Sequence, residues 1–568
     1  MISDGGKSLP ASLVLHNGKV ATVDQSDRIV EAIAINDDKI QMVGSNNEIK
    51  QLIGPNTQIF DLKGKTVVPG LIDGHAHMDR EGLKSALPSM AGVKSIDDIL
   101  QVIEGEVKSK APGEWVVTMP IGDLPSFENV PDCLKEGRFP NRFDLDKVSP
   151  NNPVYIKSIW GYWREALPLV SVANSEALRL AGIDRNTKPP ASSVEIEFDS
   201  DSGEPTGIFR EHNKMPVVEF SLMAVAPSFD VATRTDALLK SMQIYNSYGT
   251  TSVVEGHGAS ADLISAYQNI NKGDGQTVRA NLAFSPAWHT VSNADVGEMI
   301  SSWAKWLAGK GIGDEWLRVQ GFYSEADDSE ESRIRQSGGN QTGWAGFNYG
   351  SAVPTDKLKP LLIEAARNGI RTVAVLPYML DVFRDVNKEA SIEGQRWVFG
   401  HITTLTTDEI AAIRDLGLSV TTHTSGFLYK RGLQKLNDIG AERENEIVPL
   451  RSLLDAGVPV SLATDNVPVS MLFCAWHAIA RVCRDTDQKI APDQALTREE
   501  ALRCMTMAGA HLTFEEEIKG SLEPGKLADL VVLSDDILTC EEDRIQHIVS
   551  DLTVVGGKVV YERNKDQK

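Results

Sequence analysis

Two histidines separated by one residue follow an apolar run and have the spacing of a metal-binding pair. The run over residues 67–72 leads into His75 and His77. Side chains alternate between the two faces of a strand, so positions two apart point the same way. Two imidazoles on one face can bind a divalent metal. The alternative is a chance pair on a surface strand. Pro-Gly at 69–70 ends one apolar segment and Asp-Gly at 73–74 breaks the next, which favours a strand end instead.

The composition indicates a globular protein and excludes some partners. The chain has 568 residues, a formal net charge of -22, 41% hydrophobic and 24% charged residues, which is ordinary globular usage. An acidic balance argues against nucleic acid and anionic membrane as partners, and no apolar stretch has transmembrane length. Five cysteines without paired spacing, and no basic-then-apolar leader, lead us to expect a cytoplasmic protein. A small-molecule substrate and a homodimer, the commonest oligomer, are the expected partners.

Both ends of the chain consist of short β-rich segments separated by tight turns. At the N-terminal end these segments are residues 13–15, 19–23, 29–35 and 39–44; at the C-terminal end they are residues 528–533 and 552–561. Gly-Gly at 556–557 predicts a hairpin turn. Neither group is large enough for a core of its own. We therefore predict one small β-sandwich built from residues 1–68 and 512–568.

Between the two ends, the pattern predicts an α/β fold, a (β/α)8 TIM barrel over residues 69–511. Strand-like and helix-like segments alternate from about residue 248, and with the strand before His75 they make eight units. Ser/Thr-x-x-Glu capping boxes, as at Thr406 and Thr497, mark helix starts. The mixed stretch at about 80–235 is predicted to be a long insertion after the first barrel strand.

The residues at the predicted strand ends are the candidate site residues, because barrel enzymes have their active sites at the C-terminal ends of the strands. In strand order, these ends carry His75 and His77, Glu255 and His257, Trp288 and His289, Tyr323 and Glu325, Pro377 and Tyr378, His401, His423 and Asp465. Six of the eleven histidines in the chain belong to this set. A concentration of imidazoles at one edge of the barrel predicts a metal site there.

Two sequence stretches connect the chain to a known family. Residues 68–77 (VPGLIDGHAH) together with residues 520–533 (GSLEPGKLADLVVL) resemble the amidohydrolase superfamily. The closer resemblance is to family 3, the N-substituted formamide deformylase-like and YtcJ-like proteins. Residues 203–207 (GEPTG) and 464–468 (TDNVP) support it. The resemblance implies a metal-dependent barrel with a two-ended sandwich, and an enzyme acting on carbon–nitrogen bonds other than peptide bonds.

The family's metal ligands match this chain only in part. His75, His77, His401 and Asp465 occupy positions of metal ligands, and the aspartate in relatives also takes a proton from the attacking water. Tyr323 stands where relatives carry a lysine that can be carboxylated to bridge two metals. Residues 375–377 (VLP) stand where they have a fifth-strand histidine. We therefore expect a divalent metal, zinc, with one ion rather than two.

Three outcomes for the site remain open. One ion binds His75, His77 and Asp465, with His401 or a water completing it; or other strand-end residues replace the missing ligands; or the site is degenerate. We assign His75, His77, His257, His401 and Asp465 as metal ligands. Asp465 and Tyr323 are assigned as catalytic. Glu255, Trp288, His289, Glu325 and His423 are assigned to substrate binding.

The expected reaction is hydrolysis of an amide, formamide, urea or cyclic amide by metal-activated water. Asp465 would accept the proton of that water and pass it to the leaving amine. Tryptophan and tyrosine in several segments, among them Trp160 and Trp344, suggest a partly aromatic substrate. Two alternatives are a metal-dependent lyase of the decarboxylase type and a binding protein whose site has lost its chemistry.

Overall fold

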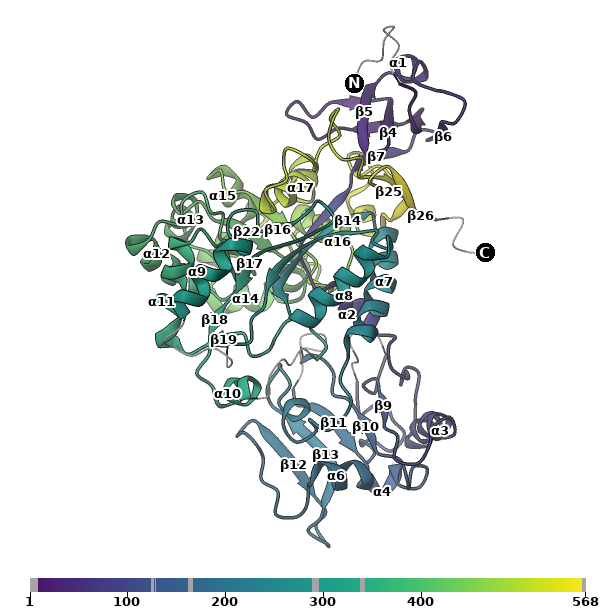
Figure 1. Ribbon diagram of the computed structural model, residues 1–568, viewed down its shortest axis with the longest axis vertical. Coiled ribbons are helices and arrows are strands. Elements are labelled where there is room, and N and C mark those ends of the chain that lie inside the picture. The colour runs from purple at the N-terminus through teal and green to yellow at the C-terminus, as the bar shows by residue number, and fades with distance from the viewer. Residues whose placement is uncertain are drawn as a thin grey trace.

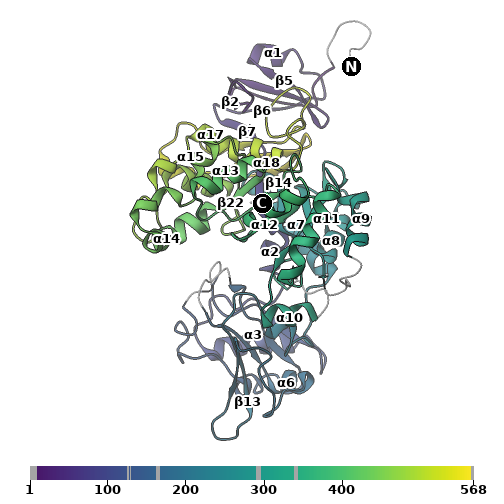
Figure 2. The same cartoon turned by 90° about the vertical axis from the view of Figure 1, so that its left-hand side faces the viewer.

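The computed structural model describes residues 9–123, 127, 129–161, 167–288, 296–337 and 343–563. Three parts follow one another along the long axis of the molecule (Figures 1 and 2). A β-sandwich that contains strands from both ends of the chain lies at one end. A (β/α)8 barrel lies in the middle, and a lobe formed by the insertion after the first barrel strand lies at the other end.

The barrel sheet has eight parallel strands in sequential order, which confirms the predicted fold class. They are β8 (Leu71–Ala76), β14 (Thr250–Ala259), β15 (Arg279–Phe284), β17 (Leu317–Tyr323), β20 (Thr372–Ala374), β21 (Val398–Phe399), β22 (Ser419–Thr422) and β23 (Val460–Leu462). The backbone N–H of Asp465 donates to the carbonyl of His75 at 2.9 Å, which joins the chain after the last strand to the first. Helices such as α8 (Ala261–Lys272), α11 (Thr355–Arg367) and α13 (Thr407–Asp415) connect the strands.

The predicted capping boxes are present and fix where helices begin. Thr406 caps α13 through the N–H of Glu409, and the Glu409 carboxylate returns to the N–H of Thr406. Thr497 and Glu500 form the same arrangement at α17 (Arg498–Cys504). Each box satisfies N–H groups that have no partner within the helix. These two helices therefore start at defined residues.

The two chain ends share one sheet, as the sequence predicted. Strand β7 (Thr66–Pro69) pairs in parallel with β2 (Lys19–Ala21) and antiparallel with β24 (Leu530–Leu533). The six-stranded sheet has the order β26-β25-β24-β7-β2-β3, with β3 (Ile29–Val30), β25 (Ser550–Val555) and β26 (Lys558–Glu562). It packs on a four-stranded sheet of β5 (Lys39–Gly44), β4 (Ala32–Asn36), β1 (Leu13–His16) and β6 (Gln58–Asp61). Buried Leu15, Ile33 and Leu530 belong to the shared core.

The insertion leaves the barrel directly after His77 and lies on the side opposite to the sandwich (Figure 1). Its five-stranded sheet has the order β12-β13-β11-β10-β9. Those strands are β9 (Val116–Thr118), β10 (Val154–Ile156), β11 (Leu169–Ala173), β12 (Val194–Phe198) and β13 (Pro205–Glu211). The sandwich continues into the N-terminal end of β8 and the insertion follows its C-terminal end. The insertion is therefore the part of the chain that covers the strand ends.

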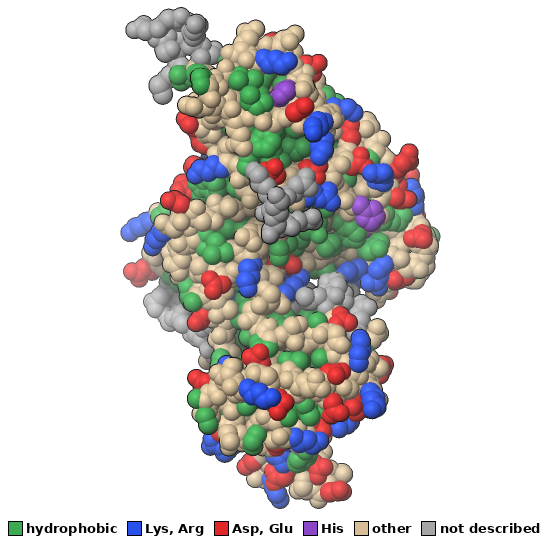
Figure 3. Space-filling model, turned by 90° about the vertical axis from the view of Figure 1, so that its right-hand side faces the viewer, with side chains coloured by type: hydrophobic (Ala, Val, Ile, Leu, Met, Phe, Trp, Pro, Cys, Tyr) green, Lys and Arg blue, Asp and Glu red, His purple; other side chains and the backbone are tan. Residues whose placement is uncertain are grey.

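Charged side chains are mixed on the surface. One face of the molecule carries acidic and basic groups interspersed over all three parts (Figure 3). Within the described ranges, none of the helices combines the length and apolar character that a membrane-spanning helix requires.

His477 is a buried histidine remote from the strand ends, and it predicts a pH effect on stability. It lies on α16 (Met471–Ala480), stacks on Tyr429 at 4.4 Å, and neither ring nitrogen has a hydrogen-bond partner among the described residues. Burial lowers its pKa from 6.5 to about 3. The unfolded chain therefore binds more protons below pH 6.5, and stability falls as the pH falls.

We expect His477→Leu to reduce this acid sensitivity. Between pH 7 and pH 5, wild type should lose about 2 kcal/mol more unfolding free energy than the variant, at about 1.4 kcal/mol per pH unit below 6.5. Urea denaturation at the two pH values measures this difference. His547→Leu, at an exposed position, is the control and should retain the wild-type dependence. Equal losses in wild type and His477→Leu would contradict the prediction.

Candidate metal centre

Five side chains from four barrel strands converge at the C-terminal end of the barrel. His257 Nδ1 lies 3.1 Å from both His75 Nε2 and His77 Nε2. His401 Nε2 lies 3.3 Å from His75 Nε2, and Asp465 Oδ1 lies 3.2 Å from His77 Nε2. Ligands of one ion held at 2.0–2.1 Å are separated by about 2.9–3.4 Å. The donor atoms therefore have the spacing of metal ligands, in two overlapping groups of three that share His75: one with His77 and His257, the other with His401 and Asp465.

The chemistry of the donors fits a divalent cation. Burial lowers the pKa of His77 to about 4 and holds the pKa of His75 and His257 well below 6.5, so the imidazoles are neutral. Burial alone would raise the pKa of Asp465. Its hydrogen bond with His77 holds that pKa well below its usual value, so Asp465 is a carboxylate. Neutral imidazoles and one carboxylate are ligands that zinc and similar ions prefer.

Backbone geometry at the strand ends directs these side chains inward. His401 and Asp465 have left-handed backbones, with φ of 56° and 50°, a conformation that costs a non-glycine residue roughly 1 kcal/mol or more. Gly256 permits β14 to pass beside the first histidine, because a Cβ there would lie 2.0 Å from His75 Nδ1. Such strained positions are typical of functional sites, where the surrounding structure holds them.

A buried carboxylate joins the first and the last strand of the barrel, both of which lead to proposed ligands. Asp73 accepts hydrogen bonds from the N–H of His75 at 3.1 Å and from the N–H of Thr464 at 3.0 Å. Burial raises the pKa of Asp73 to about 7. Asn466 Oδ1 accepts from the N–H of His77 at 2.7 Å. These contacts join β8 to the segment after β23 and so set the distance between the histidine pair and Asp465.

Three of the other residues assigned from sequence lie in the same cavity. His423 Nε2 is 3.6 Å from Asp465 Oδ2. The Tyr323 hydroxyl donates to Glu325 Oε2 at 2.7 Å, and the Tyr323 ring lies 5.2 Å from the His257 ring. All three border a cavity of about 490 Å³. Its volume suits a small ligand.

Glu255 and Trp288, expected to bind substrate, do not border this cavity among the described residues. Glu255 is fully buried behind His77, with Oε2 at 4.0 Å from His77 Nδ1, and its Oε1 accepts from Tyr267 at 2.7 Å. In this position its carboxylate faces the His77 ring from the side away from the cavity. Trp288 packs between Trp303 and Phe322 at 5.7 and 5.9 Å, as a core residue does. His289 lies outside the described residues.

The walls of the cavity come from distant parts of the chain, and sequence reasoning missed most of them. They include Arg80 on α2 (Met78–Leu83), Trp160 and Met215 of the insertion, Phe347, and Phe427 on the π-helix η3 (Ser425–Lys430). Val375 and Leu376 form an apolar wall where relatives would carry the fifth-strand histidine. A helix that begins after His77 places Arg80, three residues on, near the same face. The sequence spacing could therefore have identified Arg80 as a site residue.

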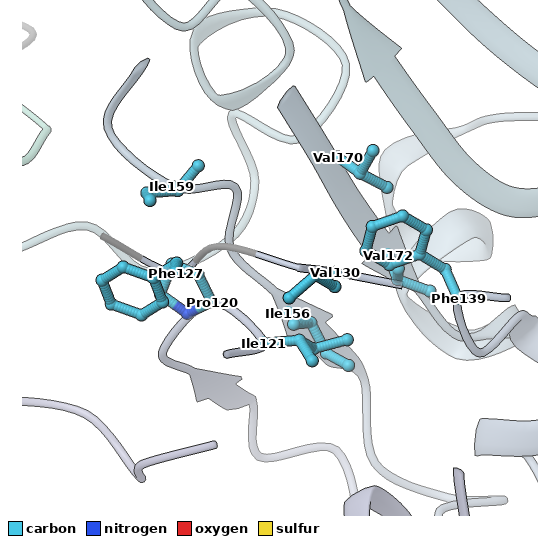
Figure 4. A pocket seen from close by; sticks show the side chains of 9 residues that line it. All are labelled: Pro120, Ile121, Phe127, Val130, Phe139, Ile156, Ile159, Val170 and Val172. Carbon is cyan, nitrogen blue, oxygen red and sulfur yellow. The ribbon is translucent and has the colours of Figure 1, made fainter. Parts of the chain in front are cut away.

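A second hollow in the insertion is a poor candidate for a ligand site. Nine apolar residues enclose it, among them Ile121, Phe139 and Val172 (Figure 4). It holds about 10 Å³, no more than one water molecule would occupy. A further hollow of the insertion, of about 390 Å³, is bordered by Arg138, Glu197 and Arg210 and contains none of the metal donors. The cavity at the barrel mouth is the candidate site because it holds the donor cluster.

A parallel (β/α)8 barrel with imidazole and carboxylate donors at its strand ends defines an enzyme of the metal-dependent barrel class. The chain belongs to the amidohydrolase family, whose model matches residues 58–561, and the resemblance read from the sequence is confirmed.

Curated relatives and solved structures agree with this membership. N-substituted formamide deformylase of Arthrobacter pascens is 28% identical, with 97% of this chain and 98% of that protein covered. Putative amidohydrolase YtcJ of Bacillus subtilis is 23% identical, over 89% and 90% of the two chains. A crystal structure of an uncharacterized metal-dependent hydrolase from Pyrococcus horikoshii has a TM-score of 0.66 at 19% identity, covering 94% and 99%.

Proposed function

We propose that this protein is a metal-dependent hydrolase that cleaves a carbon–nitrogen bond of a small, partly aromatic amide, formamide, urea or cyclic amide. The observation that carries the proposal is the convergence of four imidazoles and Asp465 at the edge of a 490 Å³ cavity. The full-length similarity to a protein named N-substituted formamide deformylase supports the choice of bond.

One zinc ion is the proposed cofactor, held by His75, His77, His257, His401 and Asp465. A bound divalent ion lowers the pKa of a water ligand to about 7 and polarises a carbonyl. Two ions are disfavoured because Tyr323 cannot supply the bridging carboxylate that a modified lysine would supply. His257, on the second strand, supplies an imidazole in place of the histidine that is missing from the fifth strand.

In this proposal the protein's own groups move one proton and orient the amide. Asp465 accepts the proton of the attacking water and delivers it to the amine nitrogen as the carbon–nitrogen bond breaks. His423, 3.6 Å from Asp465 Oδ2, orients that carboxylate. Tyr323 faces the cavity beside His257, and its hydroxyl would exchange the hydrogen bond it donates to Glu325 for one to the substrate carbonyl. Trp160, Phe347 and Phe427 supply an apolar wall for the rest of the substrate.

A panel of substrates tests the proposed function. Protein loaded with zinc is incubated with N-formyl, N-acetyl, N-carbamoyl and cyclic amides that carry phenyl or benzyl groups, and amine release is measured. We expect turnover of at least one class, loss on chelation and recovery on adding zinc. His75→Asn should be inactive. His212→Asn, a histidine on the surface of the insertion, should retain activity. Turnover that survives complete removal of metal would contradict the proposal.

A further inference from the structure

Arg80 is a buried cation without the hydrogen bonds that the buried Arg279 and Arg481 form. It is 2% exposed and borders the cavity. Among the described residues, its Nε has no hydrogen-bond partner, and its nearest acid is Asp465, with Oδ1 3.9 Å from a terminal nitrogen. Arg279, equally buried, forms two hydrogen bonds with Asp529 at 2.7 and 3.1 Å. Arg481 donates to the carbonyls of Ile447 and Ile490, both at 2.8 Å.

The charge around Arg80 leaves it available to a ligand. A buried guanidinium that lacks hydrogen bonds is costly, so it normally has an anion or several carbonyls beside it. Among the described residues, Asp465 is the only acid within 4.0 Å of the Arg80 guanidinium, and its Oδ1 is already 3.2 Å from His77. Burial raises the pKa of Asp79 and Glu255 and the charge of Arg80 partly offsets this, but the short contacts of those carboxyls are with Arg234 and Tyr267. A divalent ion at the donor cluster would add positive charge. The cavity beside Arg80 is therefore a favourable place for an anionic group.

We propose that Arg80 binds a carboxylate of the substrate, so that the molecule hydrolysed is an N-formyl or N-acyl amino acid with an apolar or aromatic side chain. This inference rests on the proposed function. The carboxyl carbon of an amino acid lies about 2.5 Å from its nitrogen, so an acid held at Arg80 keeps the scissile nitrogen close to Asp465. The aromatic part would contact Trp160, whose ring lies 5.5 Å from the Arg80 guanidinium carbon.

The reaction is balanced without any further reactant. One water adds to the acyl carbon, the bond between that carbon and the amino acid nitrogen breaks, and the nitrogen takes the proton that Asp465 carries. The products are formate or another carboxylate and the free amino acid. No atom changes its oxidation state overall.

Two substrates that differ only in the carboxylate test this inference. They are racemic N-formylphenylalanine and N-formyl-2-phenylethylamine. Wild type should have a kcat/KM at least 10²-fold higher for the acid, and Arg80→Gln should reduce that ratio by about 10²-fold, because a buried charge-assisted contact is lost. Arg80→Lys should restore part of it. Arg414→Gln, a control at an exposed arginine, should leave the ratio unchanged. Wild type that prefers the neutral formamide would overturn the inference, and so would an unchanged ratio in Arg80→Gln.

A binding measurement separates this inference from the proposed function. Calorimetry compares 3-phenylpropionate with 3-phenylpropanamide on metal-free and zinc-loaded protein. We expect metal-free wild type to bind the acid at least tenfold more tightly than the amide, and Arg80→Gln to lose that preference. Preference for the acid without hydrolysis of any formamide would refute the proposed function while Arg80 keeps its role. Hydrolysis of formamides without any preference for the acid would refute the role of Arg80 alone.

Discussion

Asp465→Asn should reduce kcat for amide hydrolysis by about 10³-fold. Asparagine has the shape of aspartate but cannot accept the proton of the attacking water, and a positioned general base contributes about 10²–10⁴-fold. Asp465 Oδ1 is 3.2 Å from His77 Nε2, while its Oδ2 lies 3.6 Å from His423 Nε2. One oxygen therefore faces the donor cluster and the other faces His423 at the edge of the cavity.

Metal content must be measured alongside this rate, because Asp465 is also a proposed ligand. The comparison is made at saturating zinc with the bound ion quantified in each sample. Asp381→Asn, at an exposed carboxylate of α12 (Met379–Glu389), is the matched control and should keep the wild-type kcat. If zinc-loaded Asp465→Asn turned over at the full rate, Asp465 would have no part in proton transfer, as a lyase would allow.

His257→Ala should weaken zinc binding by at least about 10²-fold. His257 Nδ1 is equally close, at 3.1 Å, to the Nε2 atoms of His75 and His77. Replacing it with alanine therefore removes one of the proposed ligands. Even residues that only support ligands change metal affinity by about 10–100-fold, and a direct ligand should exceed that. Competition with a chromophoric chelator measures the affinity.

The neighbouring His423 provides the contrast. Its ring nitrogen is 3.6 Å from Asp465 and its ring lies edge-on to that of His401 at 5.0 Å, but it belongs to neither of the donor groups found among the described residues. His423→Asn should therefore change zinc affinity by less than about tenfold. Equal affinity of His257→Ala and wild type would mean that His75, His77, His401 and Asp465 hold the ion alone. The second strand would then supply no ligand.

Local sequence patterns were sufficient for the framework of the site. Apolar runs that alternate with capped helices predicted the barrel, because parallel strands are buried on both faces and each helix start needs a cap. The two β-rich ends predicted a shared sandwich because neither could bury a core alone. His75 and His77 followed from the two-residue period of a strand, and they do lie within reach of His401 and Asp465.

The rest of the site depends on geometry that spacing does not encode. Glu255 and His257 are two apart on β14 and should share a face, yet only His257 reaches the cavity. The pairing of β14 shifts register on both sides of Glu255, which rotates the strand. Arg80, Phe347 and Phe427 come from segments far apart in the sequence and meet only after folding. A local pattern carries no information about such a meeting.

The number of metal ions bound per chain tests the central claim most directly. Protein purified without chelators, saturated with zinc and freed of excess ion should contain one zinc per chain by elemental analysis, and a double variant of His75→Ala with His77→Ala should contain none. Two ions per chain in wild type, or one ion retained by the double variant, would contradict a single site built on His75 and His77.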